Sequence, residues 1–596
     1  MNIWLGCIFG LLLSGVVYGA VSIPDVVVSP TKYDSFIHTS GQDVRVITSD
    51  ELLALGLTTF TEIASLVPGF SLVNSGGDPS LFVRGLPSNQ TKVFLDGIDL
   101  SDVISPQRTP ALSMLSIHNI DRIEILSGTQ GSLYGSGTAG GVIHIFTKSN
   151  SDHVPNQLQV EFGDRIHRGS ISTSHQFSNT HVYLSGATSL TDTHSWVLNS
   201  TESDQDKLSS LHFGIKHRVP FGTIQTTFIQ SNRWLDIDNG FPISDDTDRT
   251  NNGDQTLSQV KVTVPVAQSE LIMSYSSSRL RRGQRDPDPA VDTANYTSLL
   301  EQIEFMAKLP DFGGHAIVLG FDSQLETGQA DSVLYQDFPK TSQSTQGLFV
   351  DWLYLQPIVS FRGGSRYQRY ETIAQQRSIM TYHVGLFGEV PVLNILANVS
   401  LQTGYRSPSL YEQKAPFGGN PSLRAEESQT LELSLSKSLR QSQFEVTVYK
   451  NEISDLITYT TAYTNASLLT TSQGVEYSWS YFPGDLIQFI KLYYTHIDSN
   501  QPRVPVNKMS AVSHLSFPIV DVGLALHCMG RRKRDSVLNA TSIDPYTTLD
   551  VTLTRALSDM DSIYLQVDNL TDVLTQDAVG YQNAGRIISI GYRRQF

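Results

Sequence analysis

From about residue 152 to the end of the chain, apolar and polar residues alternate in short stretches. Leu431, Leu433 and Leu435 are separated by Glu432 and Ser434, and the same spacing recurs over residues 444–449, 549–554 and 563–568. A period of two places one apolar and one polar face on a β-strand. Residues 152–596 are therefore predicted to be mainly β.

Two architectures suit this alternation. In a soluble sandwich the apolar faces meet another sheet, whereas in a membrane barrel they meet lipid and the polar faces line the lumen. Roughly 440 residues, at about 20 per strand and connection, give about 22 strands, the size of plugged outer-membrane transporters. This size favours a large (about 22-stranded) antiparallel transmembrane β-barrel, with the sandwich as the alternative.

Residues 23–150 mix short apolar stretches with glycine-rich turns instead of long alternation. Thr48-Ser49-Asp50 predicts the capped start of a helix that continues through Leu55. A second short helix is expected from Thr61 to Leu66, because Pro68-Gly69 ends it. This part of the chain is therefore predicted to be an α/β domain.

The first 20 residues are predicted to be a signal peptide. Ile3 to Val17 is almost wholly apolar and too short to span a bilayer, and small residues follow at Gly19 and Ala20. No Lys or Arg precedes this stretch, so a retained anchor helix is the alternative. Removal of Cys7 leaves Cys528 alone, which excludes an intrachain disulfide and a multi-cysteine metal site.

The net charge of the chain excludes one class of binding partner. The chain has 42 Lys and Arg against 58 Asp and Glu, a net charge of −16. We expect no nucleic-acid partner, because phosphate binding needs a basic surface. We recognise no Ser–His–Asp arrangement, paired catalytic carboxylates or phosphate-binding glycine loop in the sequence, so the chain is not expected to be an enzyme.

Six short blocks follow one another between residues 66 and 145. They are Leu66-Val67-Pro68-Gly69-Phe70, Leu81-Phe82-Val83-Arg84-Gly85, Val93-Phe94-Leu95-Asp96-Gly97-Ile98, Ile120-Asp121-Arg122-Ile123-Glu124-Ile125-Leu126-Ser127-Gly128, Leu133-Tyr134-Gly135-Ser136-Gly137 and Gly140-Gly141-Val142-Ile143-His144-Ile145. In this order and spacing they resemble the plug domain of TonB-dependent outer-membrane receptors. The final strand, which ends in Phe596, resembles the assembly signal of outer-membrane barrels, although a soluble edge strand is the alternative.

The resemblance implies an N-terminal α/β plug domain over residues 38–150, lying in the lumen of a barrel over residues 152–596. It places the protein in the lipid of the bacterial outer membrane, and we expect a monomer. It also implies that residues 24–31 are the Ton box. There Asp25, Val26, Val27, Val28 and Ser29 would pair by strand addition with TonB, part of an inner-membrane energy-transducing complex.

The substrate prediction depends on a finer resemblance. Residues 579–586, Val-Gly-Tyr-Gln-Asn-Ala-Gly-Arg, are similar to the entry into the last strand of cobalamin receptors. A ferric-siderophore or haem receptor is the alternative, although no His lies between Tyr405 and Leu423, where a haem receptor would carry one. A passive pore or an outer-membrane enzyme is the alternative of a different class. Energy-coupled import of cobalamin is therefore predicted.

Two sets of site residues follow from the resemblance. Substrate is expected on the plug's apical loops, at Asn74, Ser75, Gly76 and Gly77 and at Leu100, Ser101, Asp102 and Val103; ordinary solvated turns are the alternative. Cobalamin receptors hold calcium with Asp residues of early extracellular loops, and here Asp204 and Asp206 match that pair. The next loop is expected to supply further ligands from Asp236, Asp238 and Asp248, and it also contains Asp245 and Asp246; solvated acidic loops are the alternative.

Contacts between plug and barrel can also be anticipated. Arg84 is expected to form buried bidentate pairs with barrel carboxylates. The family usually has Arg-Gly-Pro where this chain has Ser127-Gly128-Thr129. One ionic contact is therefore expected to be missing or replaced.

Overall fold

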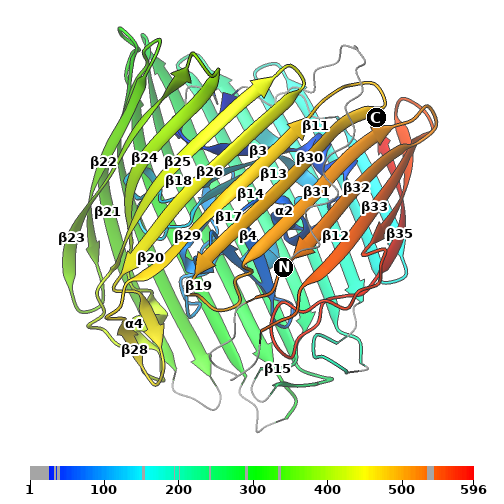
Figure 1. Ribbon diagram of the computed structural model, residues 1–596. Coiled ribbons are helices and arrows are strands. Elements are labelled where there is room, and N and C mark those ends of the chain that lie inside the picture. Colours follow the sequence, from blue (N-terminus) through cyan, green and yellow to red (C-terminus); the bar gives the residue numbers. More distant parts are fainter. Residues whose placement is uncertain are drawn as a thin grey trace, which may run out of the picture.

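The computed structural model describes residues 26–32, 35–36, 41–150, 155–192, 195–200, 202–240, 243–288, 293–332, 337–532 and 542–596. Most of these residues form a closed barrel of 22 strands, each antiparallel to its neighbours (Figure 1). The last strand pairs with the first, so the sheet closes on itself. The predicted barrel and its size are confirmed.

The first half of the barrel contains β10 (Gln157–Gly163), β11 (Ile166–Phe177), β12 (Thr180–Asp192), β13 (Gln205–Val219), β14 (Gly222–Asp236), β17 (Thr250–Val266), β18 (Ser269–Arg285), β19 (Ala294–Lys308), β20 (His315–Ser332), β21 (Phe338–Tyr354) and β22 (Ser360–Glu371). The second half contains β23 (Gln376–Val390), β24 (Ile395–Arg406), β25 (Glu426–Leu439), β26 (Ser442–Ser454), β29 (Thr470–Tyr481), β30 (Ile487–Ser499), β31 (Asn507–Ser516), β32 (Asp521–Met529), β33 (Tyr546–Ala556), β34 (Asp561–Asp568) and β35 (Ile587–Gln595).

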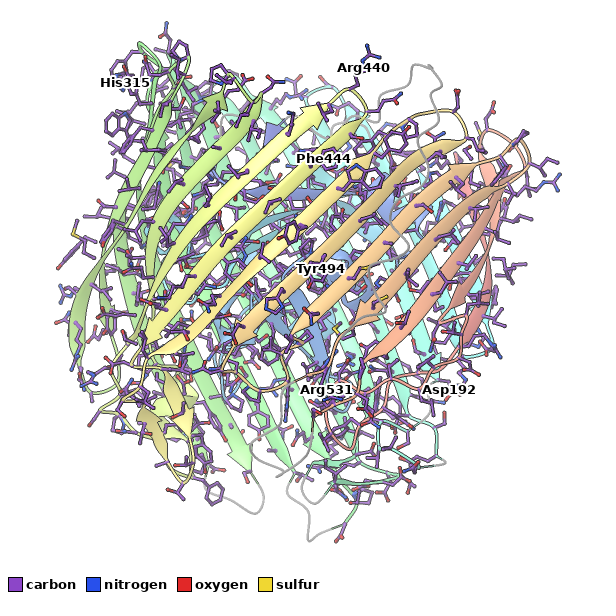
Figure 2. The ribbon with its side chains drawn as sticks, in the orientation of Figure 1. Asp192, His315, Arg440, Phe444, Tyr494 and Arg531 are labelled. Carbon is purple, nitrogen blue, oxygen red and sulfur yellow. The ribbon has the colours of Figure 1, made fainter. Side chains whose placement is uncertain are left out.

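The alternating pattern sorts side chains between lipid and lumen. On β25 the leucines at 431, 433 and 435 are exposed on the outer surface, whereas Glu432 and Ser434 are buried inside. Figure 2 shows Phe444 and Tyr494 on the outside of the barrel wall. Among the described residues, no helix is long and apolar enough to cross a membrane.

The two ends of the barrel differ in the length of their connections. Only Pro220 and Phe221 separate β13 from β14, and only Ala267 and Gln268 separate β17 from β18. The opposite end carries long connections with β15 (Asn239–Gly240), β16 (Ile243–Ser244), α4 (Leu410–Lys414), β27 (Ile457–Tyr459) and β28 (Tyr463–Asn465), which lie at the bottom of Figure 1. In outer-membrane barrels short turns face the periplasm and long loops face outside, so we name the ends accordingly. In Figure 2, His315 and Arg440 mark the periplasmic end, and Asp192 and Arg531 lie toward the extracellular end.

An α/β domain, the plug, lies in the lumen, as the blue elements behind the barrel wall in Figure 1 show. Its five-stranded sheet has the order β3-β8-β9-β6-β7. The elements are β1 (Val26–Val27), β2 (Ser35–Phe36), β3 (Val44–Thr48), α1 (Ser49–Ala54), α2 (Phe60–Leu66), β4 (Phe70–Asn74), β5 (Pro79–Val83), β6 (Thr91–Leu95), β7 (Ile98–Asp99), β8 (Ile120–Ser127), α3 (Gly131–Tyr134) and β9 (Gly141–Thr147), with short 3-10 turns at Ser88–Gln90, Leu112–Met114, Ile117–Asn119 and Lys148–Asn150.

Both predicted plug helices are present. Thr48 caps α1 by accepting a hydrogen bond from the Glu51 amide at 3.3 Å. Thr59 and Glu62 form a reciprocal capping box at the start of α2. The chain turns out of α2 at Gly69, whose φ of +72° suits glycine.

Buried charges join the plug to the barrel wall. The Arg84 side chain is fully buried and forms a bidentate pair with Glu476, at 3.0 Å to each carboxylate oxygen, and a further pair with Glu432. Lys508 of β31 caps the end of α2, because its Nζ donates to the carbonyl oxygens of Ala64, Val67 and Phe70 at 3.1, 2.8 and 2.8 Å. The expected role of Arg84 is confirmed.

Neutral hydrogen bonds join plug and barrel two residues after Ser127, the position at which the family usually carries a second arginine. The hydroxyl groups of Thr129 and Thr430 lie 2.7 Å apart, and Thr430 also donates to Asn451 at 2.8 Å. The Ser127 side chain itself cannot form an ion pair.

The two ends of the chain bear on the predicted signal peptide and on the predicted final strand of the barrel. Residues 1–20, predicted to be a signal peptide, and Asp25 lie outside the described residues. The barrel begins at Gln157. On β35, Ile588 and Ile590 face outward, and Arg594 on the same face lies 3.5 Å from Asp561.

Candidate functional site

The turn between β4 and β5 is the first apical loop of the plug. Asn74, Ser75 and Gly76 are partly exposed, whereas Gly77 is buried. Gly76 and Gly77 have φ values of +81° and +85°, and a Cβ on Gly77 would lie only 2.8 Å from the Leu235 side chain. Glycine is therefore needed at 77 both for backbone conformation and for the close approach of the barrel wall.

One arginine fastens this loop to the barrel. Arg233 of β14 binds Asp78 at 2.8 Å and the Gly77 carbonyl oxygen at 2.8 Å. The same guanidinium group forms a bidentate pair with Asp206 at 2.9 and 2.8 Å. Asp206, predicted to be a calcium ligand, therefore has its carboxylate engaged by Arg233.

The second apical loop follows β7, and its predicted substrate contacts lie inside the plug–barrel interface. Leu100, Ser101, Asp102 and Val103 are all buried. The Val103 amide donates to Ser298 at 3.0 Å, and Asp102 pairs with Arg282 at 2.7 Å. The exposed tip of the loop is instead Pro106-Gln107. The Ser105-Pro106 step was the local turn signal for this tip.

The last extracellular connection lies over the first apical loop. A Cβ on Gly76 would be 3.6 Å from the Tyr581 ring. The Gln582 amide donates to the Trp196 carbonyl oxygen at 2.8 Å, and the Leu198 amide donates to Gly580 at 2.9 Å. Residues 578–583 therefore connect the loop after β12 to the plug apex.

An acidic cluster lies next to this junction. One carboxylate oxygen from each of Glu202, Asp238 and Asp245 falls within 4.8 Å of the others. The Ser195 hydroxyl donates to Asp245 at 2.7 Å. The almost fully buried Asp204 accepts a hydrogen bond from the Trp196 amide at 2.7 Å. These are oxygen ligands of the kind that calcium prefers.

Electrostatics show that these carboxylates repel one another. Burial, together with Asp245 and Asp238, raises the pKa of Glu202 to about 7. Burial, with Asp238 and Glu202 nearby, raises the pKa of Asp204 to about 8. A bound cation would relieve this repulsion, so the residues present fit a divalent cation.

Only some of the predicted calcium ligands lie in or beside the acidic cluster. Asp238 joins the cluster and Asp204 lies beside it, whereas Asp236 accepts from the Gln205 amide at 3.0 Å and Asp206 pairs with Arg233. Asp248 lies outside the cluster of three. Glu202 was missed, although it lies two residues before Asp204 and so faces the same side of an extended chain.

The segment that was predicted to be the Ton box is held against the plug by hydrogen bonds. The amides of Val28 and Ser29 and the Ser29 hydroxyl donate to one oxygen of Glu124 at 2.9, 2.8 and 2.7 Å. Tyr134 donates its hydroxyl to the Ser29 carbonyl oxygen at 2.6 Å. Val27 and Ser29 are fully buried. In this conformation their backbone cannot pair with a strand of another protein.

Comparison with known proteins defines the class. The family model described as "TonB-dependent Receptor Plug Domain" matches residues 37–142, and the one described as "TonB dependent receptor-like, beta-barrel" matches residues 127–570. The chain belongs to the TonB-dependent receptor family. It is therefore an outer-membrane protein of a family of transporters and receptors, which implies TonB as partner and a small-molecule substrate.

Individual relatives carry different substrates in their names. The chain is 22% identical to "Vitamin B12 transporter BtuB" of Vibrio vulnificus (strain YJ016), over 93% of this chain and 91% of the relative. The ferric yersiniabactin uptake receptor FyuA from Yersinia pestis superposes with a TM-score of 0.78 at 16% identity, covering 94% of this chain and 98% of that one. The siderophore receptor PirA from Acinetobacter baumannii superposes with a TM-score of 0.79 at 14% identity, covering 93% and 98%. The solved structures share the fold; they do not identify the substrate.

Proposed function

We propose that this protein imports cobalamin across the outer membrane. Relatives named as vitamin B12 transporters match more than nine-tenths of both chains. The observation that carries the proposal is the position of residues 579–586, whose sequence resembles cobalamin receptors and whose Tyr581 lies against the apical Gly76. Cobalamin would rest on residues 74–78, beneath this connection.

We further propose that calcium orders the loops above the substrate. Glu202, Asp238 and Asp245 would hold the ion, with Asp204 beside them. Ser195 and Trp196 link the cluster to Gln582, which neighbours Tyr581. A cation there would favour one arrangement of the loops and so complete the site over Gly76.

Coupling to TonB would depend on the hydrogen bonds that hold Ser29 against the plug. Substrate on the apical loop would shift the plug toward conformations in which Glu124 no longer holds Val28 and Ser29. Residues 25–29 would then be free to add a strand to TonB, which remodels the plug. The four hydrogen bonds at Val28 and Ser29 are the contacts that this release must break.

Equilibrium binding to the purified protein tests the substrate. We expect nanomolar affinity for cyanocobalamin and no measurable binding of ferric siderophores or haem. Tyr581→Ala should weaken cyanocobalamin binding about tenfold, as expected for an aromatic contact at the centre of a site. Tyr459→Ala, which alters an exposed tyrosine of β27, is the matched control and should bind normally. Tight binding of a siderophore without cyanocobalamin binding would overturn the proposal.

A further inference from the structure

Two cavities lie between the plug and the periplasmic half of the barrel wall. The first, of about 590 Å³, is bordered by Val28, Lys32 and Tyr134, and we call it the Ton-box cavity. The second, of about 680 Å³, lies between α1 and strands β26, β29, β30, β31 and β32, and we call it the α1 cavity. Both fall in the size range of small-molecule sites.

The two cavities have opposite charge. Seven Lys and Arg residues and four Asp and Glu residues line the Ton-box cavity, the reverse of the balance in the whole chain. Two basic residues, Arg45 and Lys491, and four acidic residues line the α1 cavity. A cleft lined by one sign of charge concentrates ions of the opposite sign, so the Ton-box cavity suits an anion and the α1 cavity does not.

The basic lining comes largely from the barrel wall. Lys216, Lys261 and Lys308 lie on β13, β17 and β19, within a few residues of the periplasmic ends of these strands. Acidic groups also border the cavity, but Glu304 pairs with Lys32 and Asp322 with Arg366. Asp96 and Glu270 are the other two acidic residues of the lining. The three wall lysines outnumber these two carboxyl groups.

Stacked aromatic side chains border the Ton-box cavity, and one of them is a histidine whose Nε2 can still bind a ligand. His144 is more than nine-tenths buried and stacks on Phe94 at 4.7 Å between ring centroids. Within the described part of the chain, His144 Nε2 has no hydrogen-bond partner. Burial lowers the pKa of His144 to about 3, and the positive charges of Lys32, Arg122 and Lys261 lower it in the same direction. The imidazole is therefore neutral and available to a ligand.

The Ton-box segment is itself a wall of this cavity. Val28 and Lys32 border it, and Tyr134 holds Ser29 from the same side. A pull on residues 26–32 would remove this wall and enlarge the cavity toward α3, without first moving α1 or β3. The α1 cavity has no such connection with the Ton-box segment among its lining residues.

We propose that the Ton-box cavity is a transit site that binds an anionic group of the substrate as it leaves toward the periplasm. The phosphodiester of cobalamin and the carboxylates of ferric siderophores share this chemistry. The inference rests on the proposed import function for its transport step, but the anion site itself can be tested without any substrate. Lys216, Lys261 and Lys308 would supply the field, and the neutral His144 a hydrogen-bonding atom.

Charged thiol reagents test the anion site in the purified protein. Thr263→Cys places a thiol in the Ton-box cavity and Ser480→Cys one in the α1 cavity, both in a Cys528→Ser background. An anionic sulfonatoethyl methanethiosulfonate should react with Thr263→Cys about tenfold faster than its trimethylammonium counterpart, relative to the ratio at Ser480→Cys. Changing the three wall lysines to Gln should abolish this preference, and changing them to Arg should preserve it. Equal reaction ratios at both thiols would overturn the proposal.

Uptake tests the route. A bulky neutral maleimide on Thr263→Cys should stop cyanocobalamin uptake without reducing its binding at the cell surface, whereas the same adduct on Ser480→Cys should leave uptake intact. The reverse result would overturn the Ton-box cavity as the exit. If the intact protein binds no cyanocobalamin, the proposed function fails, and the reagent ratios still decide the anion site.

Discussion

At the scale of single residues, a few buried charges set how firmly the plug is held. Arg84 lies between Glu432 and Glu476, and its charge offsets theirs in an interior where an unpaired carboxylate is costly. Lys508 instead donates to three backbone carbonyls, those of Ala64 in α2, Val67 at its C-cap and Phe70 at the start of β4. Each therefore links barrel and plug by a different chemistry.

Replacement of Arg84 should loosen the plug. Arg84→Gln leaves two buried carboxylates without their cation, and breaking such a pair costs about 3–5 kcal/mol. We expect faster hydrogen exchange of amides throughout the plug sheet. Arg84→Lys, which keeps the charge without bidentate geometry, should give an intermediate rate. Unchanged exchange in Arg84→Gln would show that this cluster does not anchor the plug.

Replacement of Lys508 should have a local effect. Lys508→Met keeps the length of the side chain but removes the three hydrogen bonds to residues 64, 67 and 70, at a cost of about 1.5–3 kcal/mol. Exchange should accelerate in residues 60–74 and remain unchanged in β6 and β9. Lys437→Met, which removes a half-buried lysine bonded to a turn carbonyl far from the plug, is the control. A uniform change across the plug would contradict this local role.

At the scale of elements, residues 28–29 and the acidic loop each depend strongly on a few hydrogen bonds. A single carboxylate, Glu124, accepts three hydrogen bonds from Val28 and Ser29. The acidic loop depends on Ser195 and Trp196 for its contacts with the last connection. Small changes at either place should therefore shift a whole segment.

Weakening the hydrogen bonds between Glu124 and residues 28 and 29 should raise the affinity of the protein for TonB. Glu124→Gln replaces a charged acceptor by a neutral one and weakens the hydrogen bonds from residues 28 and 29. The isolated periplasmic domain of TonB should bind this variant several-fold more tightly without substrate. Asp121→Asn, which alters another partner of Arg122 away from the segment, is the matched control. Equal affinity of Glu124→Gln and the parent protein would argue against release as the limiting step.

Calcium binding should depend on pH. Because the pKa values of Glu202 and Asp204 are raised to about 7 and about 8, protons compete with the cation near neutrality. The folded loop binds more protons than the unfolded one, so without calcium its stability falls as pH rises through this range. Calcium affinity, measured by calorimetry, should rise over the same range and then level off. Asp238→Asn should abolish binding, whereas Asp248→Asn should not; a pH-independent affinity would contradict the site.

Elements with a regular period were predictable, and contacts between distant loops were not. The outward leucines of β25 follow from alternation alone, and Arg84 was found because its block resembles the family. The partnership of Arg233 with Asp78 and Asp206 joins three segments far apart in sequence, and no local pattern specifies it. Likewise, Leu100 and Val103 are buried because the loop folds back on the barrel wall, whereas a solvated turn would have exposed them.

At the scale of the whole molecule, the closed barrel, the plug and the buried N-terminal segment are joined by direct contacts. The barrel provides a lumen, the plug lies within it, and the proposed role of the segment at Val27–Ser29, which contacts the plug, is to connect it to TonB. A passive pore needs neither the plug nor the segment. Import should therefore depend on residues 25–29 even when the substrate site is intact.

The most direct measurement compares cyanocobalamin uptake by cells whose only cobalamin receptor is this protein or the same protein without residues 25–29. We expect saturable uptake with the intact protein and none with the deletion, although both bind cyanocobalamin at the cell surface. Equal uptake by the two proteins, or no uptake by the intact one, would contradict TonB-coupled import of cobalamin.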